Sequence, residues 1–188
     1  MSAPPRVVLD ACVLFPSVLR EILLGVAQAG RFVPLWSDRL LAEWAIAAGR
    51  AGPVATAQAQ GEIATLRATW PGASVPADPT LEARLWLPDP ADRHVLAAAI
   101  TGGASTIVTR NLRDFPRAAL QDHGVSAISP DDFLMRLWLE DSPPVAAAVA
   151  AARAATEAHS GRPQPLRPLL RRAGLPRLGK SLSSAEID

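Results

Sequence analysis

The sequence has a single cysteine, Cys12, among its 188 residues. One cysteine cannot form a disulfide within its own chain, and it cannot build a zinc site from several thiolates. Such sparing use of cysteine is typical of proteins in a reducing compartment, so we expect a cytoplasmic location.

Long hydrophobic runs are also missing. The most apolar long stretch, residues 145–155, is dominated by alanine, is interrupted by Arg153, and falls short of the ~18 apolar residues that a membrane span needs. Residues 1–6 run directly into a short strand-like segment without the apolar region of a signal peptide. The sequence predicts no membrane association and no export.

Lysine is nearly absent, since Lys180 is the only one and the other basic residues are arginines. The formal net charge is +1, but residues 1–150 carry −3 and residues 151–188 carry +4. This asymmetry argues against a uniformly basic nucleic-acid coat and indicates an acidic body with a basic tail.

The body alternates between two hydrophobic patterns. Short β-branched runs predict strands, and apolar residues at helical spacing predict helices between them. The expected strands cover residues 6–10, 32–36, 105–109 and 125–128, and the expected helices cover residues 17–29, 37–50, 53–70, 92–102, 116–122 and 129–141. Parallel strands need crossover connections that can hold a helix, so the alternation predicts an α/β fold with a central, mostly parallel sheet.

A second region is expected after residue 141. We assign residues 1–141 to the α/β domain and residues 142–188 to an extension with an alanine-rich helix over 142–159. Residues 162–180 contain six cations, no acid and four prolines, so we expect this basic tail to fold weakly or against a partner.

Two aspartates follow expected strands. Asp10 comes directly after Val7-Val8-Leu9, and Asp114 lies just beyond the strand at 105–109. The carboxyl ends of parallel strands share one edge of the sheet, where ligand sites of α/β proteins collect. Either residue taken alone would be explained as a turn or cap residue.

Three more acids lie on or beside expected helices. Asp92 is at a position that suits a helix N-cap, Asp89 is a second acid in the same loop, and Glu43 borders the apolar stripe of the helix over 37–50. Taken together with Asp10 and Asp114, they could converge on one pocket. Carboxylates ~5 Å apart repel by roughly 3 kcal/mol per pair at an effective dielectric constant of ~20, so such a group needs protons or a hard cation. Oxygen ligands favour Mg²⁺ or Mn²⁺ over zinc.

The acids occur in four segments in a characteristic order: Val-Val-Leu-Asp10, Leu41-Ala42-Glu43-Trp44, the run from Asp89 to Ala99, and the run from Ile107 to Phe115. In this order and spacing, residues 6 to about 135 resemble the PIN-domain family of Mg²⁺-dependent ribonucleases, which includes the VapC-type toxins. The resemblance implies a PIN-like three-layer α/β/α sandwich, here followed by the C-terminal helical and basic extension.

The resemblance also implies residue roles. Asp10, Glu43, Asp92 and Asp114 would be the catalytic and metal-binding acids, with Asp89 and Asn111 as secondary pocket residues. Cys12 departs from the family pattern, which commonly has asparagine there. It is either a buried thiol or a contact at the edge of the pocket.

RNA hydrolysis would follow from a Mg²⁺ ion that activates water and neutralises phosphate charge. Histidine is not needed as a base, and we expect His94 to be structural. Arginines near the acids are candidates for binding RNA phosphates; they are Arg93, Arg110, Arg113 and Arg117. The five tryptophans have apolar spacings and are expected in the core.

The family resemblance implies a cognate antitoxin that covers the acidic pocket. Whether the protein also forms a homodimer is left open by the sequence. A non-catalytic PIN-like scaffold that binds RNA or a protein is the main competing function. A dehalogenase-type phosphotransferase is disfavoured because position 12 is cysteine, and a dinucleotide-binding module because no glycine-rich turn follows the first strand. The basic tail could bind phosphate, dock the antitoxin or pack on the body.

Overall fold

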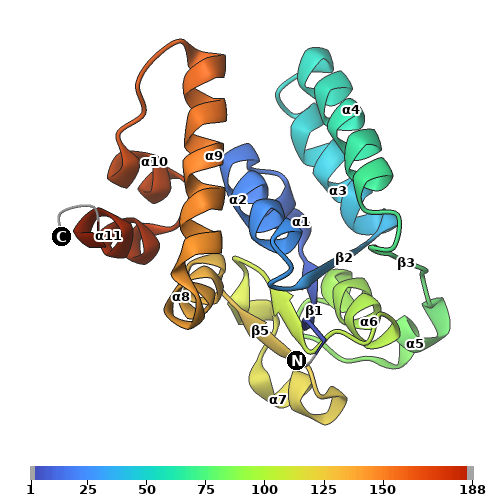
Figure 1. Cartoon of the computed structure of the whole chain (residues 1–188). Helices are drawn as coiled ribbons and strands as arrows, with labels where there is room; N and C mark the ends of the chain where they lie inside the picture. Colours follow the sequence, from blue (N-terminus) through green and yellow to red (C-terminus); the bar gives the residue numbers. More distant parts are fainter. Residues whose placement is uncertain (1–2, 186–188) are drawn as a thin grey trace. The chain divides into compact units, whose positions relative to one another are not determined.

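The computed structural model describes residues 3–185, which form two compact units. The first unit comprises the chain up to Phe15 together with Val33–Ile128, and the second comprises Pro16–Phe32 and the residues from Ser129 onward. Each unit is therefore built from two separate stretches of sequence. Figure 1 labels most of the helices and strands of both units.

The first unit is built around a parallel five-stranded sheet in the order β3-β2-β1-β4-β5. Its strands are β1 (Arg6–Leu9), β2 (Val33–Ser37), β3 (Ser74–Val75), β4 (Thr106–Val108) and β5 (Ser126–Ile128). In the central register Val8 lies between Leu35 and Ile107, and all three side chains are fully buried. The sequence prediction of a parallel α/β sheet is confirmed.

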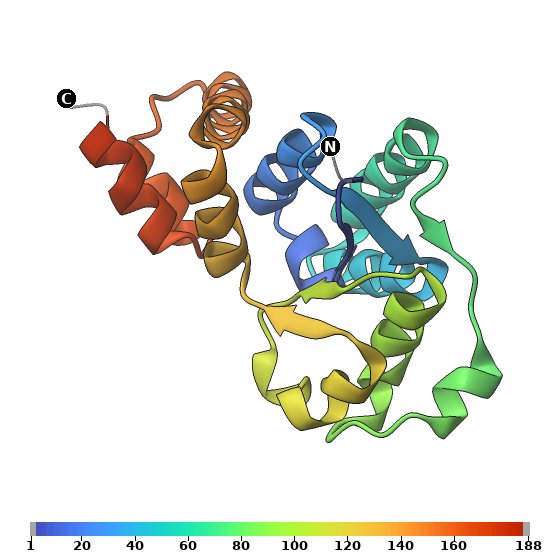
Figure 2. The ribbon, with the colours of Figure 1, turned by 60° about the horizontal axis from the view of Figure 1, so that its bottom comes forward.

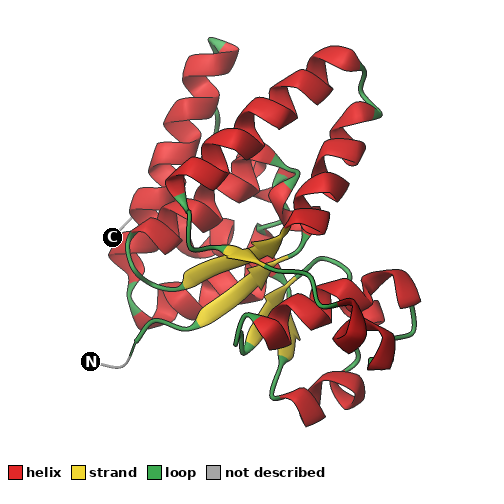
Figure 3. Ribbon diagram, turned by 90° about the vertical axis from the view of Figure 1, so that its right-hand side faces the viewer, coloured by secondary structure: helices red, strands yellow, loops and turns green. Residues whose placement is uncertain are grey.

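Helices cover both faces of this sheet (Figure 3). The helices of the first unit are α1 (Ala11–Leu14), α3 (Asp38–Gly49), α4 (Pro53–Thr69), α5 (Pro79–Arg84), α6 (Arg93–Thr101) and α7 (Arg117–Leu120), with 3₁₀ turns η1 (Pro90–Asp92), η2 (Leu112–Asp114) and η3 (Gln121–His123). The α3–α4 connection leads outward from β2 to β3, whereas α6 leads back across the sheet to β4. Since crossovers between parallel strands are right-handed, this reversal puts α6 on the opposite face from α3 and α4.

The reversal of strand order falls between β1 and β4. The chain first adds β2 and β3 on one side of β1 and then β4 and β5 on the other. At such a switch point the loops after the two strands part to opposite faces and leave a crevice at the carboxyl ends. Asp10 and Thr109 directly follow these two strands.

The second unit contains α2 (Ser17–Gln28), α8 (Pro130–Glu140), α9 (Ser142–Ser160), α10 (Leu166–Arg172) and α11 (Pro176–Ala185). The alanine-rich face of α9 packs against α2, and a Cβ added at Gly25 would lie 3.0 Å from the Cβ of Ala148. Phe32 and Phe133 meet edge to face with ring centroids 5.1 Å apart. No helix within residues 3–185 is long and apolar enough to cross a bilayer.

The expectation that residues 162–180 fold weakly or against a partner is wrong for most of this tail. These residues include α10 and most of α11, which pack on each other and, through α11, on α8 (Figure 2). Five leucines are buried there; they are Leu169, Leu170, Leu175, Leu178 and Leu182. Prolines precede or begin both helices, where the missing N–H costs no hydrogen bond. The expected division at residue 141 also differs from the grouping by contacts, which places α2 and α8 with α9–α11.

Candidate metal centre

Asp10 is held in place at the end of β1. Its side chain is 9% exposed, and its Oδ2 atom accepts hydrogen bonds from the Thr109 hydroxyl at 2.6 Å and the Cys12 thiol at 3.0 Å. Its backbone N–H donates to the carbonyl oxygen of Val108 at the end of β4. Both side-chain hydrogen bonds use Oδ2, so they fix the orientation of the carboxylate at the end of β1.

Asp89 and Asp92 lie on the turn that leads into α6. Asp89 caps this turn, because its Oδ1 accepts a hydrogen bond from the N–H of Ala91 at 2.8 Å. Asp92 occupies the N-cap position of α6, but its side chain makes no capping hydrogen bond. Asp92 therefore stands at the expected N-cap position, but the explanation of its side chain as a hydrogen-bonding cap is wrong.

Asp114 ends the 3₁₀ turn η2 that follows β4. The amide nitrogen of Asn111 donates to its Oδ2 at 2.5 Å, and the Arg113 guanidinium lies 3.6 Å from its Oδ1. The N–H of Asn111 in turn donates to the Thr109 hydroxyl at 3.0 Å. One connected set of hydrogen bonds thus orients both Asp10 and Asp114.

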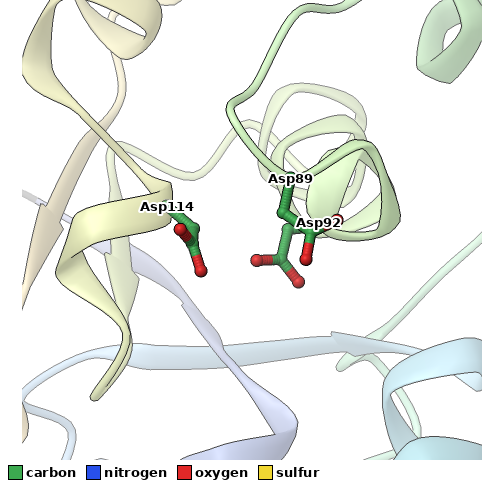
Figure 4. A group of neighbouring side chains, drawn as sticks. All are labelled: Asp89, Asp92 and Asp114. Carbon is green, nitrogen blue, oxygen red and sulfur yellow. The ribbon is translucent and has the colours of Figure 1, made fainter.

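Asp89, Asp92 and Asp114 come together (Figure 4). One carboxylate oxygen from each lies within 4.8 Å of those of the other two. Burial and the negative charges of Asp10, Asp89 and Asp114 raise the pKa of Asp92 from 3.8 to about 6. Repulsion among the carboxylates therefore remains at Asp92, and a cation among their oxygens would relieve it.

Glu43 lies outside this group of three. Its Oε1 accepts a hydrogen bond from Nε2 of the buried His94 at 2.9 Å and lies 3.5 Å from Nε of Arg39. Partial burial raises the pKa of Glu43, but the hydrogen bond and charge of His94, together with Arg39, outweigh it and lower the pKa. Arg39 also binds Glu82 and the carbonyl oxygen of Ala91. Glu43 thus ties α3 to α6, and Arg39 ties α3 to the turn that carries the aspartates.

Cys12 contacts the pocket edge, one of the two roles left open for it. Besides donating to Asp10, its half-buried sulfur accepts a hydrogen bond from the N–H of Arg110 at 3.2 Å. Burial and the negative charge of Asp10 raise the pKa of the Cys12 thiol to about 12. Cys12 therefore stays protonated at neutral pH and acts as a donor toward Asp10.

Sequence reasoning did not identify Thr109 or Arg39. Thr109 could have been found as the polar residue that ends the strand at 106–108, and Arg39 by its i, i+4 spacing to Glu43. The expectation that all five tryptophans lie in the core is wrong for Trp86, which is 65% exposed and lies three residues before Asp89. Trp36 and Trp44 are buried as expected.

The phosphate candidates differ in exposure. Arg110, Arg113 and Arg117 are exposed on and after the loop that carries Asp114, as a role in binding phosphate requires. Arg93 is half-buried at the start of α6, and its Nε atom is buried with no hydrogen-bond partner within residues 3–185.

Comparison with known proteins agrees with this geometry. The PIN-domain family matches residues 6–113, more than half of the chain. The chain belongs to the PIN-domain family. Over 44 residues it is also 54% identical to a protein of Mycobacterium tuberculosis (strain ATCC 25618 / H37Rv) named "Putative ribonuclease VapC50". That alignment spans 23% of this chain and 26% of the relative's length. No solved structure matches the chain.

The acidic residues of this PIN domain fit a hard divalent cation. The donors are all carboxylate oxygens, and those of Asp89, Asp92 and Asp114, which are half-exposed or exposed, lie close enough to share one ion. Oxygen donors in this number suit Mg²⁺ or Mn²⁺, whereas zinc sites are built mainly from cysteine and histidine. The nearest histidine, His94, is engaged with Glu43 instead.

Proposed function

We propose that this chain is an endoribonuclease that depends on Mg²⁺ or Mn²⁺ and hydrolyses RNA phosphodiesters. One observation carries the proposal: three carboxylates of a PIN domain converge, beside Asp10 at the switch point of the sheet, and burial together with the charges of Asp10, Asp89 and Asp114 raises the pKa of Asp92. A cation bound among these oxygens would offset their repulsion, and a perturbed pKa in such a group is typical of functional sites.

The ligands that we propose are Asp10, Asp92 and Asp114, with Asp89 as a secondary residue. A bound cation supplies Lewis-acid activation of water and neutralises charge on the phosphate. Thr109 and Cys12 orient Asp10, and Asn111 orients Asp114.

Glu43 completes the proposed acidic set. It supports the turn with Asp92 through His94 and Arg39, and it belongs to the acids that the family resemblance implies. The exposed guanidinium groups of Arg110, Arg113 and Arg117 would bind the RNA backbone on either side of the cleaved bond.

We further propose that the protein is the toxin of a type II toxin–antitoxin system. The support is the partial similarity to a relative named as a VapC ribonuclease. The partner would be a cognate antitoxin that inserts a basic side chain among Asp10, Glu43, Asp92 and Asp114, because a charge-assisted hydrogen bond there offsets the repulsion between the acids. A short antitoxin-like reading frame next to the gene, whose product co-purifies with the protein, is the expected observation.

Cleavage of RNA by the full-length protein tests the proposal. We expect cleavage with Mg²⁺ or Mn²⁺ but not with EDTA, and a loss of at least about a hundredfold in Asp92→Asn, a typical effect of removing a group that stabilises transition-state charge. Asp122→Asn, at an exposed aspartate in η3, is the matched control and should cleave like the wild type. Metal-independent cleavage would contradict the mechanism, and RNA binding without any cleavage would favour the non-catalytic scaffold.

A further inference from the structure

The second unit carries a strongly basic surface that the nuclease site does not use. Residues 162–185 contain six cations and no acid, and all six side chains are exposed. They are Arg162, Arg167, Arg171, Arg172, Arg177 and Lys180. Of these six, only Arg177 forms an ion pair with an acid within residues 3–185; its partner is Asp132 of α8. Arg172 donates a hydrogen bond to the neutral side chain of Gln164. Charge in this region is therefore concentrated and largely uncompensated.

Hydrogen bonds from α8 and close helix packing hold α10 and α11, which carry most of these cations, in position. The buried carboxylate of Asp131 accepts hydrogen bonds from the N–H groups of Arg177 and Leu178, at 2.9 and 3.1 Å, and so satisfies the first turn of α11 from α8. The two helices pack closely where Gly179 meets α10, since a Cβ at this glycine would lie 3.2 Å from the Cβ of Leu170 and 3.9 Å from the Cα of Arg167.

Helical periodicity gathers the basic groups on the side away from this packing. Arg167 and Arg171 are four residues apart and lie on one side of α10, while Leu169 and Leu170 are buried. Lys180 lies on the exposed side of α11, opposite Leu178 and Leu182. Lys180 follows Gly179 directly, so the crossing of the helices brings it near Arg167.

We propose that this α10–α11 pair is a second RNA-binding surface, which contacts the phosphate backbone through Arg167, Arg171 and Lys180. Arginine and lysine that lack acidic partners attract phosphates without reading the bases, and they raise affinity by releasing counterions. The choice of RNA as the polyanion rests on the proposed function. A chain that binds RNA through one unit raises the effective concentration of that RNA at a site elsewhere in the same chain.

Binding of single-stranded RNA by the full-length protein in EDTA tests this proposal independently of cleavage. We expect Arg167→Gln/Arg171→Gln/Lys180→Gln to bind at least about tenfold more weakly at low salt. The slope of log K, where K is the association constant, against log salt concentration is negative. Its magnitude should decrease by about 2, because each of the three lost phosphate contacts on a single strand contributes about 0.7. Arg167→Lys/Arg171→Lys/Lys180→Arg keeps the charges and should bind like the wild type.

Two comparisons keep the result specific. Arg6→Gln/Arg50→Gln/Arg84→Gln removes three exposed cations from the other unit and should leave the slope unchanged. Poly-glutamate, as an acidic polypeptide, should compete poorly with RNA. Unchanged binding by the α10–α11 triple variant, an equal loss in the control triple variant, or equal competition by poly-glutamate would overturn the proposal.

The same samples separate this inference from the proposed function. Cleavage by the wild type combined with unchanged RNA binding by the α10–α11 variant would reject the basic surface and keep the nuclease. Binding that depends on the α10–α11 cations, without cleavage under any metal condition, would reject the nuclease and keep the surface.

Discussion

Asp92 shows how the candidate site conflicts with stability. In the metal-free protein its carboxylate faces three others, and its raised pKa means that the folded state binds a proton more tightly than the unfolded state. The contribution of Asp92 to folding is therefore fully present below pH 3.8 and is lost as the pH rises through about 6. Groups that are placed for chemistry commonly carry such a cost.

This loss of stability with rising pH gives a prediction for Asp92→Asn. Without metal, the free energy of unfolding of the variant relative to the wild type should rise by ~1 kcal/mol between pH 4 and pH 7, a value discounted for solvent screening of a partly exposed group. Urea unfolding at both pH values measures it, with Asp122→Asn as the matched control. A difference that does not change with pH would show that the neighbouring carboxylates do not act on Asp92.

Residue types and order brought out two of the acids that meet, but not the side chains that support them. Asp92 and Asp114, two of the four acids expected in the pocket, lie together with Asp89, which was expected only as a secondary residue. Thr109 escaped notice because its contact with Asp10 joins residues 99 positions apart. Helical spacing identified Glu43 at the edge of an apolar stripe, but not its hydrogen bond to His94 on another helix.

At the level of elements, the N-terminus of α11 depends on a residue from another helix. Asp131 accepts hydrogen bonds from two backbone N–H groups that would otherwise be left without partners at the start of α11. Such a contact from outside the helix replaces the capping side chain that usually comes from the residue before it.

Removing this contact should loosen the second unit. We expect Asp131→Ala to lower the free energy of unfolding by about 1–3 kcal/mol, the usual effect of losing a cap and leaving buried donors unsatisfied. Thermal or urea unfolding followed by circular dichroism measures the change. Asp122→Ala should have little effect, and an equal loss in both variants would argue against the role of Asp131.

Elements with clear periodicity were predictable, and short ones were not. The strands around residues 6–9 and 106–108 and the helices α3, α4 and α9 lie where the hydrophobic pattern predicts them. β3 has only two residues and α5 only six, so neither is long enough for its hydrophobic pattern to repeat. In α10 and α11, proline and charge suggested a weakly folded tail, but buried leucines outweigh both.

On the scale of the whole molecule, chain order and spatial grouping differ. The PIN-domain match covers residues 6–113, yet α2 within that stretch belongs to the second unit. The apolar stripe of α2 predicts a buried helix face, but not which helix covers it; that partner, α9, follows more than a hundred residues later. The proposed functions follow this grouping, with hydrolysis in the first unit and an RNA-binding surface in the second.

Binding of Mn²⁺, measured by electron paramagnetic resonance on the full-length protein, tests the central claim most directly. The account predicts one bound ion in the wild type and in Asp122→Asn, with affinity at least about tenfold lower in Asp92→Asn and Asp114→Asn, as expected when a carboxylate ligand is lost. Absence of Mn²⁺ binding by the wild type, or wild-type affinity in the two pocket variants, would contradict it.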